Sequence, residues 1–236
     1  MQSETLPIDT SMLYKKALEA EGEFFNKEYW SNWLNYTIRR RIMTFSASFF
    51  AKSIEAIQTI NYDIVEKMAD VLSSVRANNG RLFIIGSGGG AGHASHAVCD
   101  FRKLCNFESY APYDNVSELT ARVNDDGWES TILEWLKVSK YNSNDCVFVF
   151  SVGGGNEEEA VSTNIVQVLK YTKEIGASII GVASKDGGFL KKTGDAVLIV
   201  PTIDSSYITP ITEGIQSLVW HLLVSHPKLV INSPVW

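Results

Sequence analysis

The 236-residue chain has little cysteine, and the cysteines it has follow no pairing pattern. Its three cysteines are Cys99, Cys105 and Cys146, which form neither a CxxC motif nor an even set for a disulfide framework. Two of them lie in apolar runs, as buried free thiols do. The chain is therefore not a small secreted scaffold held by disulfides, and we expect it in a reducing compartment.

Positive charge and long apolar runs are scarce as well. The chain has 27 acidic residues against 21 basic ones, a formal net charge of -6, which argues against a general attraction to nucleic acid or an anionic membrane. Its only run of three bases, Arg39–Arg41, is interpreted as a solvated or subunit-facing helix face. No stretch reaches the ~18 uninterrupted apolar residues of a membrane span, and the first residues lack the apolar segment of a secretory signal. We expect a soluble cytoplasmic protein.

The sequence does show a regular alternation of helical and strand patterns beyond residue 80. Residues 11–78 are mostly helix-compatible. Strands are predicted at 81–85, 108–112, 146–151, 178–183 and 196–200. Helices are predicted at 90–104, over 116–140, at 157–175 and at 211–225. This alternation predicts an α/β fold, a three-layer, doubly wound parallel sheet, with residues 1–52 as an N-terminal helical extension and 53–236 as the α/β domain.

Aromatic side chains are concentrated in the helical N-terminal region. They are Phe24, Phe25, Tyr29, Trp30, Trp33, Phe45, Phe49 and Phe50. A segment of this length cannot bury so many aromatic rings in a core of its own, so they must pack on the α/β body or on another subunit. We therefore expect a homo-oligomer, with the extension serving oligomerisation.

Two glycine-rich loops each follow a predicted strand. The first, GSGGGA at 86–91, matches the G-x-G-x-x-A dinucleotide motif, and the second is SVGGGN at 151–156. Two such loops would bring the free backbone N–H groups of two helix N-termini to one edge of the sheet. This favours a phosphorylated small molecule held by both loops, although both could be merely tight turns. The acids at 157–159 are interpreted as first-turn residues that favour the helix dipole.

Histidines and carboxylates recur at helical spacing. His96 and Asp100 share one helix face, with His93 one turn earlier, and Glu213 and His221 share a face near the C-terminus. If the two helices meet, they gather two imidazoles and two carboxylates, a set that suits a divalent metal or acid–base catalysis. Asp100 could instead pair with a nearby base and Glu213 could be a helix-entry acid, whereas His221, inside an apolar run, needs a partner.

Taken together, these features resemble the sugar isomerase (SIS) fold and, within it, the phosphoheptose isomerase family, over residues 54–226. The family's first loop is similar to G-N-G-G-S, followed by a histidine and, four residues later, a glutamate; here His96 and Asp100 stand at those positions. A segment resembling N-D-x-G-[FW] appears at 124–128, and the K-D-G-G turn at 185–188. The family's C-terminal glutamine and histidine fall on Glu213 and His221.

The resemblance implies a tetramer with active sites at subunit interfaces and, in some members, bound zinc. It implies aldose–ketose isomerisation through an enediol, from sedoheptulose 7-phosphate to a heptose 7-phosphate. Asp100 would move a proton between C1 and C2, while His221 would serve the other oxygen or carbon. Zn²⁺ or another divalent metal would be held by His96, Asp100, Glu213 and His221. The implied substrate and phosphate contacts are Ser87, Gly88, Gly89, Gly90, Asn124, Asp125, Ser151, Gly153, Gly154, Asn156 and Lys185.

The chain departs from the family pattern at three places. The family's second loop resembles S-T-S-G-N-S, so the loop at 151–156 lacks hydroxyl donors for a phosphate. Asp100 is one methylene shorter than glutamate, and Glu213 adds a charge that would strengthen a cation site. The alternative function is a non-catalytic SIS-domain protein that binds a sugar phosphate as a regulatory or assembly factor. A nicotinamide-dependent oxidoreductase would use Glu108, about twenty positions beyond the first loop, but requires neither the second loop nor the K-D-G-G turn.

Overall fold

The structure, a computed structural model, describes residues 44–233 of the chain. The chain divides after Phe50 into two units, and the second, 51–236, contains the α/β body. The described helices are α3 (Phe45–Gln58), α4 (Tyr62–Ala77), α5 (Gly89–Cys105), α6 (Val116–Asp125), α7 (Thr131–Val138), α8 (Thr163–Ile175), α9 (Gly188–Thr193) and α10 (Ile208–Ser225), with a 3₁₀ turn η1 (Ser205–Tyr207). The strands are β1 (Leu82–Gly86), β2 (Ser109–Tyr110), β3 (Cys146–Phe150), β4 (Ser178–Ser184) and β5 (Ala196–Val200).

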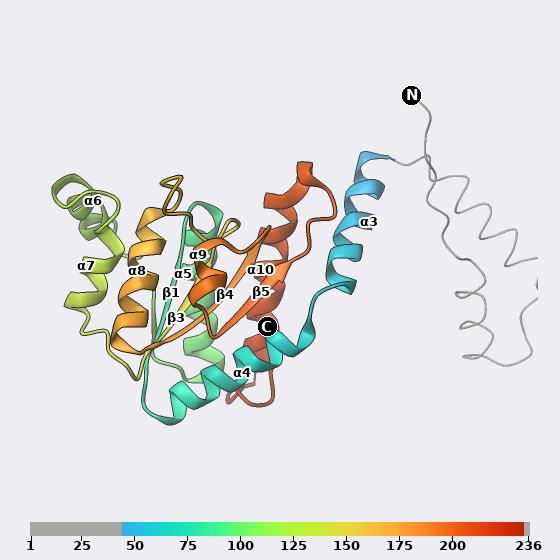
Figure 1. The fold of residues 1–236 in the computed structure, drawn as a ribbon. Coiled ribbons are helices and arrows are strands. Elements are labelled where there is room, and N and C mark those ends of the chain that lie inside the picture. Colours follow the sequence, from blue (N-terminus) through green and yellow to red (C-terminus); the bar gives the residue numbers. More distant parts are fainter. Residues whose placement is uncertain (1–43, 234–236) are drawn as a thin grey trace, which may run out of the picture. The chain divides into compact units, whose positions relative to one another are not determined.

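The five strands form one parallel sheet in the order β2-β1-β3-β4-β5. Figure 1 shows the helices arranged around this sheet. The chain goes from β1 to one neighbour, β2, and then crosses to the other, β3, so its winding direction reverses at β1. The predicted α/β class with a doubly wound parallel sheet is confirmed. The predicted boundary at residue 52 stays a prediction, and most of the N-terminal aromatic residues, with Arg39–Arg41, lie outside the described residues.

Alternate strand residues face opposite layers of helices. Phe83, Ile85 and Val149 belong to a buried cluster with residues of α7, α8 and α9. The intervening positions face the helices α4, α5 and α10, and Phe148 contacts Phe101 of α5 with ring centroids 6.4 Å apart. Both faces of the sheet are therefore covered, which explains why β1 and β3 are buried along their whole length.

Two expectations about residues 157–175, the start of the helix and the role of the acids, are wrong. The helix predicted at 157–175 begins only at Thr163, because Asn156 forms a turn: its side chain accepts hydrogen bonds from the N–H groups of Glu158 and Glu159. Asn156 also pairs with Val161 in an isolated antiparallel bridge. The acids at 157–159 consequently lie in this turn and do not cap a helix. The short helix α9 was not predicted at all.

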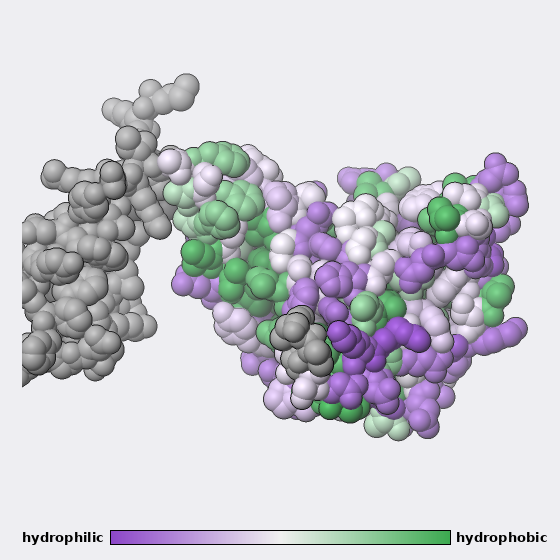
Figure 2. Space-filling model, turned by 180° about the vertical axis from the view of Figure 1, so that it is seen from behind, coloured by the Kyte–Doolittle hydropathy of each residue, from purple (hydrophilic) through white to green (hydrophobic). Residues whose placement is uncertain are grey.

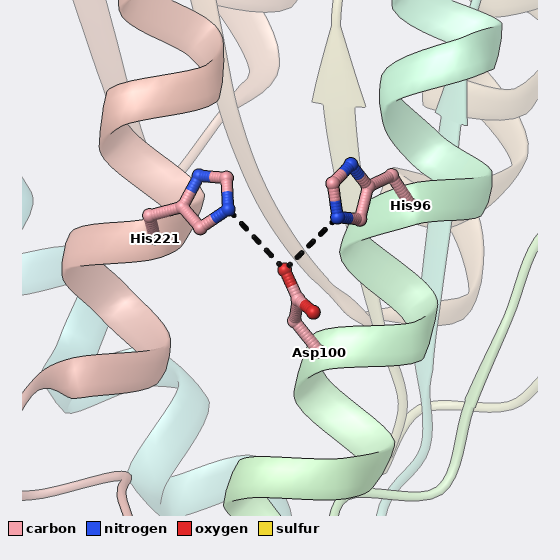
Figure 3. A group of neighbouring side chains, drawn as sticks. All are labelled: His96, Asp100 and His221. Carbon is pink, nitrogen blue, oxygen red and sulfur yellow. Dashed lines mark ion pairs between the residues drawn. The ribbon is translucent and has the colours of Figure 1, made fainter. Parts of the chain in front are cut away.

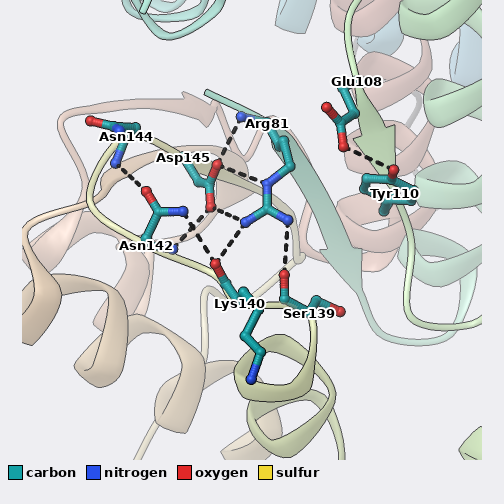
Figure 4. A network of polar contacts seen from close by, with 8 residues as sticks. All are labelled: Arg81, Glu108, Tyr110, Ser139, Lys140, Asn142, Asn144 and Asp145. Atoms are coloured by element: carbon teal, nitrogen blue, oxygen red, sulfur yellow. Dashed lines mark hydrogen bonds and ion pairs between the residues drawn. The ribbon is translucent and has the colours of Figure 1, made fainter. Parts of the chain in front are cut away.

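The amino ends of β1 and β3 are joined by a buried ion pair (Figure 4). Asp145, 1% exposed, accepts from the backbone N–H of Arg81 at 2.8 Å and from its guanidinium at 2.8 and 3.2 Å. The guanidinium also donates to the carbonyls of Ser139 and Lys140, both at 2.8 Å. The bond to Asp145 raises the pKa of Arg81. This network fixes the edge of the sheet opposite the glycine loops.

The described part of the chain accords with two further expectations from composition. Cys99, Cys105 and Cys146 are free thiols, and the last two are buried. Burial raises the pKa of Cys105 to about 11, so this thiol stays protonated at neutral pH. Among residues 44–233, no helix combines the length and the apolar character that crossing a bilayer requires.

Candidate functional site

The two glycine loops leave the sheet side by side. Both follow the carboxyl ends of neighbouring parallel strands, β1 and β3, at the place where the winding direction reverses. In doubly wound sheets this switch point is where ligands bind, because the loops diverge there and leave a crevice. The structure thus puts the loops at 86–91 and 151–156 where a small ligand would be expected.

The first loop is shaped by close backbone approaches. Gly88 precedes α5 with a φ of 57°, a conformation that favours glycine, and a Cβ at Gly90 would lie 2.4 Å from the carbonyl oxygen of Phe150. A Cβ at Gly89 would meet the Glu213 carboxylate at 2.5 Å. The carboxylate of Glu213 therefore lies at the N-terminus of α5, where the partial positive charge of the helix favours an anion.

Two side chains near this loop have different roles. The hydroxyl of Tyr113 accepts from the N–H of Gly86 at 3.0 Å and donates to the carbonyl of the same residue. Burial raises the pKa of Tyr113, so it remains a neutral phenol that fixes the end of β1. The Oγ of Ser87 is buried and has no hydrogen-bond partner within residues 44–233, so its hydrogen-bonding capacity is unused there. Ser87 was predicted as a contact, whereas Tyr113 was not.

The second loop is tied to the turn that precedes α9. Ser151 Oγ accepts from the N–H of Gly154 at 3.1 Å, and the carbonyls of Gly154 and Gly155 accept from the first N–H groups of α9 at 2.9 and 2.8 Å. A Cβ at Gly154, where φ is 72°, would lie 1.9 Å from the carbonyl oxygen of Gly187. The K-D-G-G turn is therefore required for packing against this loop.

The predicted contacts outside the two loops lie at exposed positions. Lys185 is exposed, and Asn124 donates to the neighbouring Asp125 at 2.7 Å at the exposed end of α6. A cavity of about 350 Å³ beside the second loop is lined by three carboxylates and one lysine, together with backbone and Phe189. Its acidic residues are Glu157, Glu158 and Asp186. This lining is unfavourable for a phosphate dianion.

His96 and Asp100 of α5 and His221 of α10 point toward one another between the two helices, as Figure 3 shows. Nε2 of His96 lies 3.7 Å and Nε2 of His221 lies 3.6 Å from the same oxygen, Oδ2 of Asp100. Both imidazoles are about half exposed, and the carboxylate is 18% exposed. The structure thus brings together three of the four predicted metal-binding residues, and two of these three, Asp100 and His221, are the predicted catalytic residues.

The three side chains form a donor set that fits a divalent cation. Their ligand atoms all lie within 4.8 Å of one another. Nδ1 of His221 lies 2.8 Å from the carbonyl of Ser217, so it must carry the proton, and Nε2 offers its lone pair beside the carboxylate. This orientation by a backbone carbonyl is the usual one for a metal-binding histidine. Ligand atoms around tetrahedral zinc are about 3.4 Å apart, close to the separations found here.

The fourth predicted ligand, Glu213, lies elsewhere on α10. It is two turns before His221, a distance of about 12 Å along the helix axis, and its carboxylate rests on Gly89. The i, i+8 spacing does put Glu213 and His221 on one helix face, but the two residues lie two turns apart along α10. The role of Glu213 as a ligand stays a prediction.

Sequence reasoning missed Trp220, which holds the group together. Its side chain is 1% exposed, and Nε1 donates to Oδ2 of Asp100 at 3.1 Å. The indole lies against three imidazoles, with centroid separations of 5.1 Å to His93, 5.4 Å to His96 and 4.8 Å to His221. The only sequence signal for Trp220 was its place in an apolar run beside His221. Any buried tryptophan gives that signal, so it does not point to a functional role.

Gln216 was also missed. Oε1 of this fully buried residue accepts from Nδ1–H of His93 at 3.1 Å, and its Nε2 donates to the carbonyl of Val182 at 3.3 Å. Two hydrogen bonds therefore join α5 to α10, one between His93 and Gln216 and one between Asp100 and Trp220, and the carboxylate of Glu213 lies close to Gly89 at the start of α5.

The parallel sheet, the switch-point loops and the polar side chains between α5 and α10 define a doubly wound α/β protein of the kind that binds small ligands at its switch point. The SIS domain family model matches residues 47–184, more than half of the chain. The chain belongs to the SIS domain family, as the sequence motifs suggested.

Several known proteins resemble the chain more specifically. The phosphoheptose isomerase of Helicobacter pylori (strain P12) is 27% identical over 177 residues, which cover 73% of this chain and 84% of that protein. The lincomycin biosynthesis protein LmbN of Streptomyces lincolnensis is 32% identical over 159 residues, 63% of this chain but only 54% of LmbN. The chain thus spans about half the length of LmbN.

Solved structures show the same fold. The phosphoheptose isomerase GmhA from Neisseria gonorrhoeae superimposes with a TM-score of 0.66 at 22% identity, covering 76% of this chain and 96% of that one. A phosphoheptose isomerase from Francisella tularensis gives a TM-score of 0.64 at 20% identity, and the match covers 79% of this chain and 95% of that one. These structures therefore show that the chain has the same fold.

Proposed function

We propose that this protein is an aldose–ketose isomerase of a phosphorylated sugar, converting sedoheptulose 7-phosphate or a similar ketose phosphate through an enediol. The observation that carries the proposal is the convergence of His96, Asp100 and His221 between α10 and α5, the helix that leaves the first switch-point loop. Relatives named phosphoheptose isomerases support the same reaction class.

In the proposed reaction, Asp100 carries a proton between adjacent carbons of the substrate. Its Oδ2 is oriented by the N–H of Trp220, and the carboxylate is partly shielded from water. A base of this kind needs to reach the carbon-bound proton within hydrogen-bond distance, and the fixed carboxylate supplies that geometry. The phosphate end of the substrate would lie toward the loops, near Ser87 and the backbone of 151–154.

His96, Asp100 and His221 would hold a divalent cation, with zinc favoured by the two imidazoles. When bound, such a cation supplies a Lewis acid for the carbonyl and stabilises negative charge on the substrate oxygen. Glu213 would join it only if its carboxylate left Gly89. As a ligand of the cation, His221 would contribute to holding the substrate oxygen and would not act as a free base.

We also propose a homo-oligomer in the cytoplasm. Apolar side chains are exposed on α3, where Ile54 is 54% exposed, and on α10, where Leu218 and Leu222 are 54% and 46% exposed. Figure 2 shows hydrophobic side chains gathered in one part of the visible face, against a largely hydrophilic remainder. Faces of this kind favour burial against a second copy. The three free thiols fit a reducing compartment.

The metal proposal is tested by elemental analysis of the purified protein. We expect close to one zinc or other divalent ion per chain, lost in both His96→Ala and His221→Ala, because each removes one of three donors. His226→Ala is the matched control, since His226 pairs with Glu66 outside the group. Metal content that is unchanged in the first two variants would reject this cation site.

The isomerase proposal is tested by NMR of sedoheptulose 7-phosphate in D₂O with the metal-loaded protein. We expect deuterium to enter at C1 or C2 as the aldose phosphate forms. No exchange and no product with the loaded wild type would reject an isomerase of this substrate.

Trp220→Phe is expected to weaken metal retention about tenfold, because the ring packing is kept but the N–H that orients Asp100 is lost. Competition with a chelator measures the change. Trp135→Phe, on the opposite side of the sheet, serves as the control. Equal retention in Trp220→Phe and the wild type would show that the indole only fills space.

The second candidate function is a SIS-domain protein that binds a sugar phosphate without converting it. Asp100 favours it, because this acid is one methylene shorter than the glutamate of the family pattern and its Oδ2 already accepts from the N–H of Trp220, so a sugar phosphate could bind without meeting a base within reach. This candidate predicts that sedoheptulose 7-phosphate binds in calorimetry while the deuterium assay stays negative.

A further inference from the structure

A buried glutamine joins three elements of the fold close to the candidate site. Gln216 of α10 is fully buried, yet both ends of its amide are hydrogen-bonded. Its Oε1 accepts from Nδ1–H of His93 on α5, and its Nε2 donates to the carbonyl of Val182 on β4. The amide therefore ties α10 to a neighbouring helix and to the sheet at the same time.

The rest of the buried face of α10 is almost entirely apolar or aromatic. Besides Gln216 it consists of Ile211, Thr212, Ile215, Val219, Trp220, Leu223 and Val224. Apolar contacts are non-directional, so they would stabilise a helix shifted along its axis almost as well. Hydrogen bonds require a particular distance and direction. Gln216 is consequently the buried side chain of α10 best suited to select one axial position of this helix.

No neighbour on α10 could replace Gln216 if the helix moved by one turn. Such a shift would bring Thr212 or Trp220 to the level of Gln216, because each lies four residues away. Threonine has a single hydroxyl on a short side chain, and an indole has a donor but no acceptor. The amide of Gln216 would lose its partners, and an unpaired buried polar group is unfavourable.

The same axial position brings the candidate cation group together. Trp220, one turn after Gln216, donates to Oδ2 of Asp100 on α5 at 3.1 Å. His221, the next residue, has its Nε2 3.6 Å from the same oxygen. One helical turn is about 5.4 Å long, so a shift of α10 by half a turn would take the N–H of Trp220 out of hydrogen-bond reach of Asp100.

We propose, on the basis of the proposed cation site, that Gln216 is a positioning residue that sets the axial register of α10 against α5. Its two hydrogen bonds hold Trp220 and His221 at the level of Asp100, so the donor set is in place before a divalent cation binds. Gln216 itself touches neither the cation nor the substrate. His93 anchors the amide from α5 and lies outside the group that could hold the cation.

The first test uses the chelated protein and therefore does not depend on the cation. The chain has six tryptophans, and Trp220→Phe identifies the indole N–H signal of Trp220 in ¹⁵N–¹H spectra. Gln216→Met keeps the approximate length of the side chain but loses both hydrogen bonds. We expect the proton signal of Trp220 to move upfield in this variant, because its bond to Asp100 lengthens. An unmoved signal in folded Gln216→Met would overturn the proposal.

The second test is zinc retention, measured by competition with a chelator. Gln216→Met should retain zinc about tenfold less tightly than the wild type, the lower range for loss of a group that orients metal ligands. Gln167→Met is the matched control, because α8 packs on the other face of the sheet. It should change neither zinc retention nor the Trp220 signal.

Two further variants separate positioning from stability. Asp145→Ala disrupts the network at the opposite edge of the sheet and should lower the melting temperature without weakening zinc retention. If it weakens retention as much as Gln216→Met does, Gln216 acts only through stability and the proposal is wrong. His93→Phe keeps a ring but removes Nδ1–H, so it should move the Trp220 signal in the same direction even if Gln216→Met does not fold.

The outcomes separate this inference from the proposed function. If the wild type retains no divalent ion, the cation site is rejected, while the Trp220 signal of the chelated protein still decides whether Gln216 sets the register. If the wild type retains zinc and folded Gln216→Met retains it equally well, the cation site stands and the role of Gln216 is rejected.

Discussion

Asp100→Asn is expected to lower turnover of sedoheptulose 7-phosphate by about 10⁴-fold, the upper range for removal of a general base. The amide keeps the size of the side chain and can still accept the N–H of Trp220, so α5 and α10 should remain packed together. What is lost is the negative charge that takes the proton from carbon. The measurement is hydrogen–deuterium exchange at C1 and C2, followed by NMR.

Two further variants make this result specific. Asp70→Asn removes a carboxylate from α4 that is paired with Lys228 outside the candidate site, and it should leave exchange unchanged. Asp100→Glu restores the length of the acid in the family pattern and should keep measurable exchange. Exchange that continues undiminished in Asp100→Asn, with its metal content determined in parallel, would exclude Asp100 as the base.

Asp145→Ala is expected to lower the free energy of unfolding by about 3–5 kcal/mol, the range for breaking a buried ion pair from one side. The substitution leaves the guanidinium of Arg81 without its carboxylate and removes the acceptor for two backbone N–H groups, those of Arg81 and Asn142. Urea unfolding followed by circular dichroism measures the change.

Lys137→Ala is the control for that experiment. Lys137 forms an ion pair with Glu134 one turn away, and both side chains are well exposed. Exposed pairs contribute little, so this variant should unfold at nearly the wild-type urea concentration. If Asp145→Ala unfolded at the same urea concentration as Lys137→Ala, the network of Figure 4 would contribute nothing to stability.

Most of the α/β body could be predicted because its strands are short, fully apolar runs that alternate with amphipathic helices. β1, β3, β4 and β5 all lie within a residue or so of the predicted ranges. The start of α8 could not be predicted, because the choice between a helix and the turn at Asn156 depends on a side chain bonding to two N–H groups ahead of it. Such competition is decided locally by geometry and not by periodicity.

The candidate site was predictable only as far as spacing along a single helix allows. The i, i+4 spacing placed His96 with Asp100, but the way α10 pairs with α5 is set by tertiary packing. That pairing brings Trp220 to Asp100 and Gln216 to His93, and it puts Glu213 at the level of Gly89. None of these pairings is visible in either segment alone.

The close approach of the two glycine turns before α8 and α9 limits how this protein can diversify. Gly154 and Gly188 leave no room for side chains between their backbones, so neither turn can change without the other. The turn at 157–162 lies outside that contact and contains exposed residues. Laboratory evolution toward new sugars should therefore accumulate accepted substitutions and length changes at 157–162, while positions 153–155 and 187–188 stay nearly invariant.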